Sequence, residues 1–243
     1  MYVSVVDQED AQLLDKLGII EYMVIVGGLI WISGLRLDIL FATLYLAWST
    51  KAPRQHHMNM ARNVLSYLHT TKELPLVLGG SEELKVITYT DASLWTAPKG
   101  RSVVANLTKL NADAGAVSAS TKATTVVFTS VFEPELDGVT RGFKANSRIV
   151  NILKELCQKL SELPRLWSDN EAVVNFVRGE GVAKGVRHME LRMWYCRERY
   201  KDGSVLIDWM DGVQIPSDKL TKLATREEHE IFTRDIMGHS LLD

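Results

Sequence analysis

Residues 86–93 read Val-Ile-Thr-Tyr-Thr-Asp-Ala-Ser, an alternating stretch that carries the carboxylate of Asp91. Such alternation predicts a strand with one face in a core. Three further acids stand in comparable settings. Asp169 follows a short apolar run, while Glu135 and Asp218 open helix-like runs. Four carboxylates gathered from strand ends and helix starts are what a two-metal phosphodiester hydrolase needs.

The composition describes an ordinary globular protein. The chain has 243 residues, 46% hydrophobic and 24% charged, so it is long enough for one large domain or two small ones. Its formal net charge of -2 gives no global basic signature for nucleic acid. A nucleic-acid enzyme of this composition would need local basic patches.

The cysteines and the apolar segments bear on compartment. Two cysteines, Cys157 and Cys196, form no disulfide framework and favour a reducing, intracellular setting, with cytoplasmic particle and nucleus both open. The N-terminus lacks the pattern of a signal peptide. Residues 19–35 are apolar but contain Glu21 and three glycines, so we expect a helix buried against a neighbour and no membrane partner.

The pattern of apolar residues changes near Gly79-Gly80, which we interpret as a linker or tight turn. Before it, helical spacing predicts helices over 20–35, 38–48 and 58–69. We therefore expect a helical segment over residues 1–80 and an α/β domain over 81–243.

For residues 81–243 the sequence predicts the element order β-β-β-α-β-α-α-β-α. Residues 85–90, 102–107, 114–118, 165–168 and 205–210 are strand candidates, and 135–163, 170–178 and 186–200 are helix candidates. The long helix has a possible break at Gly142. Pro134 suits a first helical turn, and Ser217 is the expected cap of the last helix.

Six motifs in order resemble those of copia-type LTR retrotransposon polyproteins, at the end of reverse transcriptase and its ribonuclease H. The family's Y-S-D-A-D-W, R-R-S-T-S-G-Y, S-S-T-E-A-E-Y, C-D-N-Q-S-A, K-H-I-D-I-R and A-D-x-L-T-K correspond to residues 89–95, 100–106, 130–136, 168–173, 187–192 and 217–222. Upstream, T-R-P-D-I resembles Leu35 to Ile39, and Y-x-x-L-V-G-S-L-L-Y-L and R-V-L-R-Y-L-K-G-T resemble residues 22–32 and 63–71. The resemblance covers about residues 20–237.

The resemblance implies a ribonuclease H-like mixed sheet flanked by helices, preceded by a helical thumb or connection segment. It implies an endonuclease that hydrolyses the RNA strand of RNA–DNA hybrids with Mg²⁺, or Mn²⁺ as substitute. The polymerase part of a reverse transcriptase, or another protein, is the further partner expected through the N-terminal helices.

Magnesium prefers oxygen ligands, so Asp91, Glu135, Asp169 and Asp218 are the expected metal ligands and catalytic residues. Each acid alone also fits a structural role, as a turn residue, an N-cap or a first-turn charge. Glu133 competes with Glu135 for the helix position. Leu136-Asp137-Gly138 aligns better with the family when Glu135 is the ligand, although Asp137-Gly138 and Pro134 depart from the family pattern.

Substrate contact is expected from two local patches. Residues 92–132 carry a surplus of cations that includes Lys99, Arg101, Lys109 and Lys122, and residues 176–201 carry seven cations against three acids. The expected nucleic-acid contacts are Arg101, Lys122, Asn170, Lys184, Arg187, His188 and Arg192. An ordinary charged helix face is the competing interpretation, and a packed His188 is the competing role for that histidine. Trp95, Trp194 and Trp209 are expected in core or rim packing.

Two other functions stay open at this point. The departures around Glu135 also fit a domesticated, inactive module that binds protein or nucleic acid. A transposase or integrase of the same fold class would use three acids, and the match at residues 217–222 argues against it.

Overall fold

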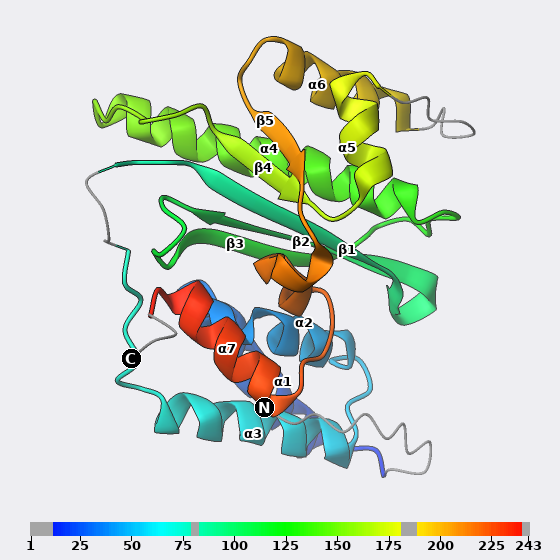
Figure 1. Cartoon of the computed structure of the whole chain (residues 1–243). Coiled ribbons are helices and arrows are strands. Elements are labelled where there is room, and N and C mark those ends of the chain that lie inside the picture. The colour runs from blue at the N-terminus through cyan, green and yellow to red at the C-terminus, as the bar shows by residue number, and fades with distance from the viewer. Residues whose placement is uncertain (1–11, 79–82, 181–188, 240–243) are drawn as a thin grey trace.

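A five-stranded mixed sheet forms the centre of the computed structural model, which describes residues 12–78, 83–180 and 189–239 (Figure 1). The strands are β1 (Ile87–Ala97), β2 (Arg101–Lys109), β3 (Ala116–Ala123), β4 (Arg165–Ser168) and β5 (Leu206–Trp209). Their order is β3-β2-β1-β4-β5. Strand β2 pairs antiparallel with both β1 and β3, and β4 pairs parallel with both β1 and β5. The strand that carries Asp91 is therefore central.

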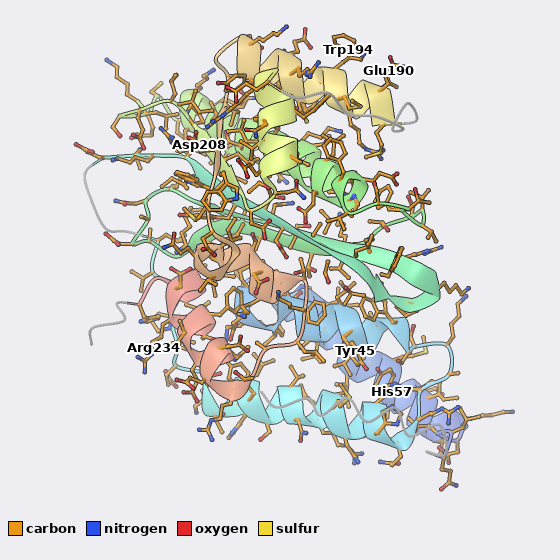
Figure 2. The ribbon with its side chains drawn as sticks, turned by 45° about the vertical axis from the view of Figure 1, so that its right-hand side comes forward. Tyr45, His57, Glu190, Trp194, Asp208 and Arg234 are labelled. Carbon is orange, nitrogen blue, oxygen red and sulfur yellow. The ribbon has the colours of Figure 1, made fainter. Side chains whose placement is uncertain are left out.

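Three helices cover one face of the sheet: α4 (Phe132–Glu155), α5 (Glu171–Arg178) and α6 (Glu190–Lys201). Their apolar sides form a core with Leu166 and Ile207 of the strands. Asp208 of β5, labelled in Figure 2, holds Arg165 and Arg178 in ion pairs and ties α5 to the sheet edge.

The other face is covered by chain segments from both ends of the sequence (Figure 1). They are α1 (Lys16–Ile32), α2 (Leu40–Trp48), α3 (Gln55–Thr70) and α7 (Arg226–Met237), with the short 3-10 turns η1 (Leu37–Ile39) and η5 (Pro216–Leu220). Two further 3-10 turns are η2 (Pro98–Gly100) and η4 (Gly212–Gln214). Phe232 and Ile236 of α7 pack on Leu107 of the sheet.

The predicted architecture, a mixed sheet flanked by helices after a helical segment, is confirmed. Details differ. Helix α4 begins at Phe132, runs unbroken through Gly142 and ends at Glu155, and β1 continues to Ala97. Gly79-Gly80 lies outside the described residues.

The expected cap of the last helix was wrong. Ser217 is buried inside η5, and α7 begins later, at Arg226. Its N-cap is Thr225, whose hydroxyl accepts from the Glu228 amide while the Glu228 carboxylate accepts from the Thr225 amide. This reciprocal Thr-x-x-Glu pattern is a stronger start signal than a single serine.

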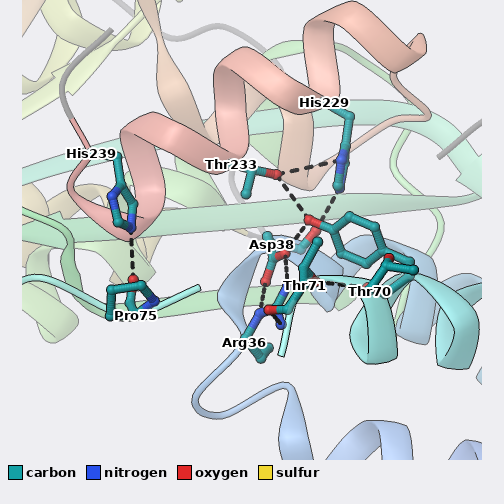
Figure 3. Close-up of polar contacts among 9 residues, drawn as sticks. Arg36, Asp38, Thr70, Thr71, Pro75, His229, Thr233 and His239 are labelled. Carbon is teal, nitrogen blue, oxygen red and sulfur yellow. Dashed lines mark hydrogen bonds and ion pairs between the residues drawn. The ribbon is translucent and has the colours of Figure 1, made fainter. Parts of the chain in front are cut away.

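A buried polar cluster around Asp38 joins the first and last elements (Figure 3). Arg36 donates to both oxygens of Asp38 at 3.0 and 2.8 Å, and the Tyr67 hydroxyl donates to Asp38 at 2.6 Å. His229 of α7 meets the Asp38 carbonyl oxygen at 3.1 Å. The Arg-x-Asp spacing of residues 36–38 thus has a structural use. The domain boundary at residue 80 stays a prediction.

Helix α1 is less buried than the sequence predicted. Only Tyr22, Val26 and Leu29 of its apolar residues are buried, against α2 and α3, and six large apolar side chains face outward. The whole circumference is apolar, so periodicity could not tell which side is covered. Within the described residues, no helix has the length and hydropathy needed to cross a membrane.

Candidate metal centre

Three carboxylates converge where β1, β4 and α4 meet. Thr90 of β1 pairs with Ser168 of β4, so the next residues of these parallel strands, Asp91 and Asp169, emerge side by side. Glu135 reaches them from the first turn of α4. One carboxylate oxygen from each of the three lies within 4.8 Å of the others, which is the spacing of a metal-ligating group.

Glu135, and not Glu133, points to this group. Glu133 turns back to Thr129 and accepts from its amide and its hydroxyl, both at 3.1 Å. Pro134 lies in the first turn of α4, where its missing N–H costs the helix nothing. Pro134 therefore does not hold Glu135 away from the other two acids.

Two glycines bring α4 close to the sheet. A Cβ on Gly138 would lie 2.7 Å from the Thr90 hydroxyl oxygen, and one on Gly142 would lie 2.6 Å from Leu166. The Asp137-Gly138 departure from the family pattern thus has a packing reason. Asp137 itself is buried and paired with Arg141 at 2.8 Å and Arg192 at 3.1 Å.

Burial and mutual repulsion disfavour the charged forms of the three acids. Burial raises the pKa of Asp91 to about 6; repulsion from Asp169 and Asp218 adds to the rise, while Thr221 and Lys222 oppose it. Burial, with the charges of Asp91 and Asp169, raises the pKa of Glu135 well above its usual value. Burial also raises the pKa of Asp169. A bound cation would relieve this repulsion.

Two buried oxygens strengthen the fit to a cation. Oε2 of Glu135 and Oδ1 of Asp169 have no hydrogen-bond partner among the described residues. A buried polar atom without a partner is costly, and a metal ion is one of the groups that could satisfy it. Oxygen donors of this kind suit Mg²⁺ or Mn²⁺.

Asp218 stands at the edge of the group and is not part of it. Its carboxylate is paired with Lys222 and, at 3.1 Å, with Lys219. It is close enough to raise the pKa of Asp91 and Asp169. Asp169, Asp218 and Lys222 all line one cavity of about 630 Å³. Among the described residues, the close group therefore has three acids, with the fourth beside it.

Three neighbours of the acids were not predicted from the sequence. The Thr221 hydroxyl donates to Asp91. The Trp209 indole donates to the Asp169 carbonyl oxygen at 3.0 Å, with half of its side chain exposed. A Cβ on Gly212 would lie 3.0 Å from Asp169 Oδ2. Thr221 belongs to the motif of residues 217–222, and that motif could have indicated its place near the acids. No sequence pattern indicated the contacts of Trp209 and Gly212.

The predicted nucleic-acid contacts fall into three groups. Arg101 and Lys122 are exposed, on β2 and β3. Asn170 caps α5 by accepting from the Val173 amide at 3.1 Å, and Arg192 is paired with Asp137. Lys184, Arg187 and His188 lie outside the described residues.

Among the described residues, three cations of the predicted patches are engaged within the protein. Lys109 is buried and paired with Asp235 at 2.7 Å, because its strand runs beneath α7. Arg178 is held by Asp208, and Arg197 donates to the Phe176 carbonyl oxygen. Trp95 and Trp194, the latter labelled on α6 in Figure 2, are more than half exposed, so neither is a core residue.

Comparison with curated proteins confirms the predicted resemblance to copia-type retrotransposon polyproteins. The chain is 26% identical over 216 residues to the retrovirus-related Pol polyprotein from transposon RE2 of Arabidopsis thaliana. It is 24% identical over 205 residues to that from transposon TNT 1-94 of Nicotiana tabacum. The matches cover 89% and 84% of this chain but 15% of each polyprotein. No family model matches.

Among solved structures, the chain is similar to LC11-RNase H1, isolated from compost by a metagenomic approach, with 13% identity and a TM-score of 0.45. That match covers 56% of this chain and 91% of the other. A foamy viral protease-reverse transcriptase in complex with an RNA/DNA hybrid matches with 11% identity and a TM-score of 0.42, over 73% of this chain and 27% of that one.

Proposed function

We propose that this chain is a ribonuclease H-type nuclease that hydrolyses the RNA strand of RNA–DNA hybrids with the help of Mg²⁺ or Mn²⁺. The observation that carries the proposal is the convergence of Asp91, Glu135 and Asp169 within ligand distance of one another. The similarity to retrovirus-related Pol polyproteins supports it independently.

Asp91, Glu135 and Asp169 are the residues that would hold the ion, with Asp218 close enough to support a second one. A divalent ion bound there supplies positive charge against the charge that develops on a phosphate during hydrolysis. The chain's own part is to fix the ligands. Thr221 donates to Asp91, the Trp209 indole donates to the backbone carbonyl oxygen of Asp169, and the missing side chain of Gly212 leaves room for the Asp169 carboxylate.

Proton release accompanies binding in this proposal. Burial and the charges of two neighbouring acids raise the pKa of Glu135 well above its usual value, which favours its protonated form. A bound cation would favour the charged form, so metal affinity should rise with pH.

The substrate is proposed from the family resemblance. Hybrids would be selected by shape and by 2′-hydroxyl groups, and the backbone would meet exposed cations such as Arg101 and Lys122. Lys222, half exposed beside Asp218, is a further cation at the mouth of the centre. The polymerase part of a reverse transcriptase remains a proposed partner.

One observation favours a second candidate, an inactive module that binds protein or nucleic acid. Asp218 is paired with two lysines, and such pairing competes with metal binding. This candidate keeps the fold and the three-acid group but lacks turnover.

The test is cleavage of an end-labelled RNA–DNA hybrid in Mg²⁺ and then in Mn²⁺. Wild-type protein should cut the RNA strand of the hybrid and spare double-stranded DNA. Asp169→Asn should lose cleavage by about 100-fold or more, because one ligand charge is removed. The exposed turn acid Asp113, changed to Asn, is the matched control and should cut normally. A folded protein that cleaves in neither metal would favour the inactive module.

A further inference from the structure

Helix α1 presents an apolar seam that no described residue covers. Leu17, Ile20, Val24, Gly27 and Trp31 follow one another at spacings of three and four residues, which places them on one line along the helix. The large ones are between 59% and 76% exposed. A repeat of this spacing is that of a helix-pairing seam.

The seam is too large for an ordinary surface. With Met23 and Ile30 beside it, six large apolar side chains are each more than half exposed. If each side chain has a total surface of about 150–200 Å², the six together expose roughly 600–800 Å². The largest apolar patch of a typical monomer is about 300–600 Å², and each partner of a stable interface contributes about 800 Å².

Charge excludes one kind of occupant. The five seam residues include no Lys or Arg, and the only cation of α1 is the exposed Lys16 at its first position. Glu21 is paired with Arg62 of α3 at 2.7 Å. Nucleic acid is held chiefly through phosphate contacts to several cations, so this face does not suit it.

The arrangement of large and small residues fits a copy of itself. Gly27 and Gly28 form a notch with no atom within 4 Å of the Cβ that either could carry. If two α1 helices run antiparallel and cross at this notch, Trp31 of each copy lies opposite Val24 of the other. Antiparallel packing also opposes the two helix dipoles, whereas parallel packing would set Trp31 against Trp31.

We infer that two copies of this chain associate through α1, antiparallel about a two-fold axis near Gly27 and Gly28. The surface lies apart from the three-acid group, so the inference does not depend on the proposed nuclease activity. Met23, Val24, Ile30 and Trp31 lie within the stretch where the two helices overlap, and both partners supply the same patch.

The first test is the mass in solution of the full chain by sedimentation equilibrium and light scattering. We expect a dissociation constant in the micromolar range, so the dimer, twice 27.3 kDa, should dominate at about 50 µM. Val24→Arg should weaken association by about 100-fold or more, because the seam offers no partner for two buried charges. Leu65→Arg, a half-exposed apolar position on α3, is the matched control and should leave the mass unchanged.

A cross-linking test fixes the orientation. In a Cys157→Ser background, which removes the exposed native thiol, Gly28→Cys should form an intermolecular disulfide under mild oxidation. Leu17→Cys should not, because at 1.5 Å rise per residue the two copies of residue 17 lie about 30 Å apart. Deletion of residues 2–11 should leave the dimer intact.

Three results would overturn the inference. They are a monomeric wild-type protein at about 100 µM, well above the expected dissociation constant; equal effects of Val24→Arg and Leu65→Arg; and cross-linking at Leu17 in place of Gly28. Circular dichroism of each variant separates loss of association from loss of folding. A monomer would point to residues 1–11 or to a polymerase part as the cover of the seam.

Discussion

Lys222 forms an ion pair with Asp218, the acid that stands beside the three-carboxylate group. The pair puts a positive charge where the sequence predicted a fourth metal ligand. The same lysine opposes the rise in pKa of Asp91. Lys222 therefore acts electrostatically on both the ligands and any phosphate brought to them.

Removal of this charge should separate metal binding from turnover. Lys222→Met should raise the affinity for Mn²⁺ roughly fivefold, because a cation several ångströms from the ion repels it. The same change should lower the rate of hybrid cleavage if Lys222 contacts phosphate. Titration calorimetry measures the first quantity and single-turnover cleavage the second. Lys72→Met, at an exposed position, is the control. Unchanged Mn²⁺ affinity would contradict this role of Lys222.

The close approach of α4 to β1 should be intolerant of one methyl group. Gly138→Ala places a Cβ 2.7 Å from the Thr90 hydroxyl oxygen and should cost about 1–3 kcal/mol of unfolding free energy. Because the helix must move, Glu135 moves too, and Mn²⁺ binding should weaken. Urea denaturation and calorimetry check both effects.

A second substitution identifies the cause. Thr90→Ala removes the atom that the new methyl group meets, so the double variant should be more stable than the sum of the two single changes predicts. Strict additivity would mean that Thr90 does not limit the approach.

Stability without metal should fall as the pH rises. The folded protein keeps the Asp91 proton up to a pH of about 6, whereas the unfolded chain releases it near 3.8. The stability that this group contributes is complete below pH 3.8 and is lost as the pH passes through 6. Between about pH 5 and 7.5 the loss from Asp91 alone should be about 1–2 kcal/mol.

Chemical denaturation in EDTA across this range measures the slope. Asp91→Asn should flatten it, and Asp113→Asn should not. Saturating Mn²⁺ should remove or reverse the slope, since the bound ion favours the charged form. If the stability of the metal-free protein rises with pH over this range, the predicted role of the Asp91 proton is wrong.

The Asp38 cluster should be a main determinant of stability. Asp38→Asn leaves the Arg36 guanidinium without its buried partner and should cost about 3–5 kcal/mol. Thermal unfolding followed by circular dichroism checks this. The exposed pair of Arg62 and Glu21 offers the comparison, and Glu21→Gln should cost less than about 1 kcal/mol.

The site was more predictable than its surroundings. Asp91 and Asp169 follow apolar runs, and parallel pairing of such runs brings the following residues together. The choice of Glu135 over Glu133 rests on helix phase, which the family pattern supplied. Asp218 was predicted by the same pattern. Its ion pairs with Lys219 and Lys222 were not, because no sequence pattern tells which way these two neighbouring side chains point.

The two errors have different origins, one in long-range packing and one in local sequence. Lys109 looks like a surface cation in the sequence, yet α7 crosses it and supplies Asp235. Ser217 looks like a cap, yet its turn closes as η5 and ends before the last helix begins. The partner of Lys109 comes from a distant element, of which local periodicity contains no record. The true start of the last helix is local, since the Thr-x-x-Glu pattern of residues 225–228 marks it in the sequence.

The contact of His229 with Asp38 spans 191 residues, and that of Tyr67 with Thr233 spans 166. On a ribosome, the first helices are made long before the helix that completes their core. The second face of the sheet can therefore close only after α7, which ends at Met237, has emerged. Late, high-contact-order closure of this kind slows folding and lengthens the exposure of apolar surface. The growing chain is accordingly one that would gain from a chaperone during synthesis.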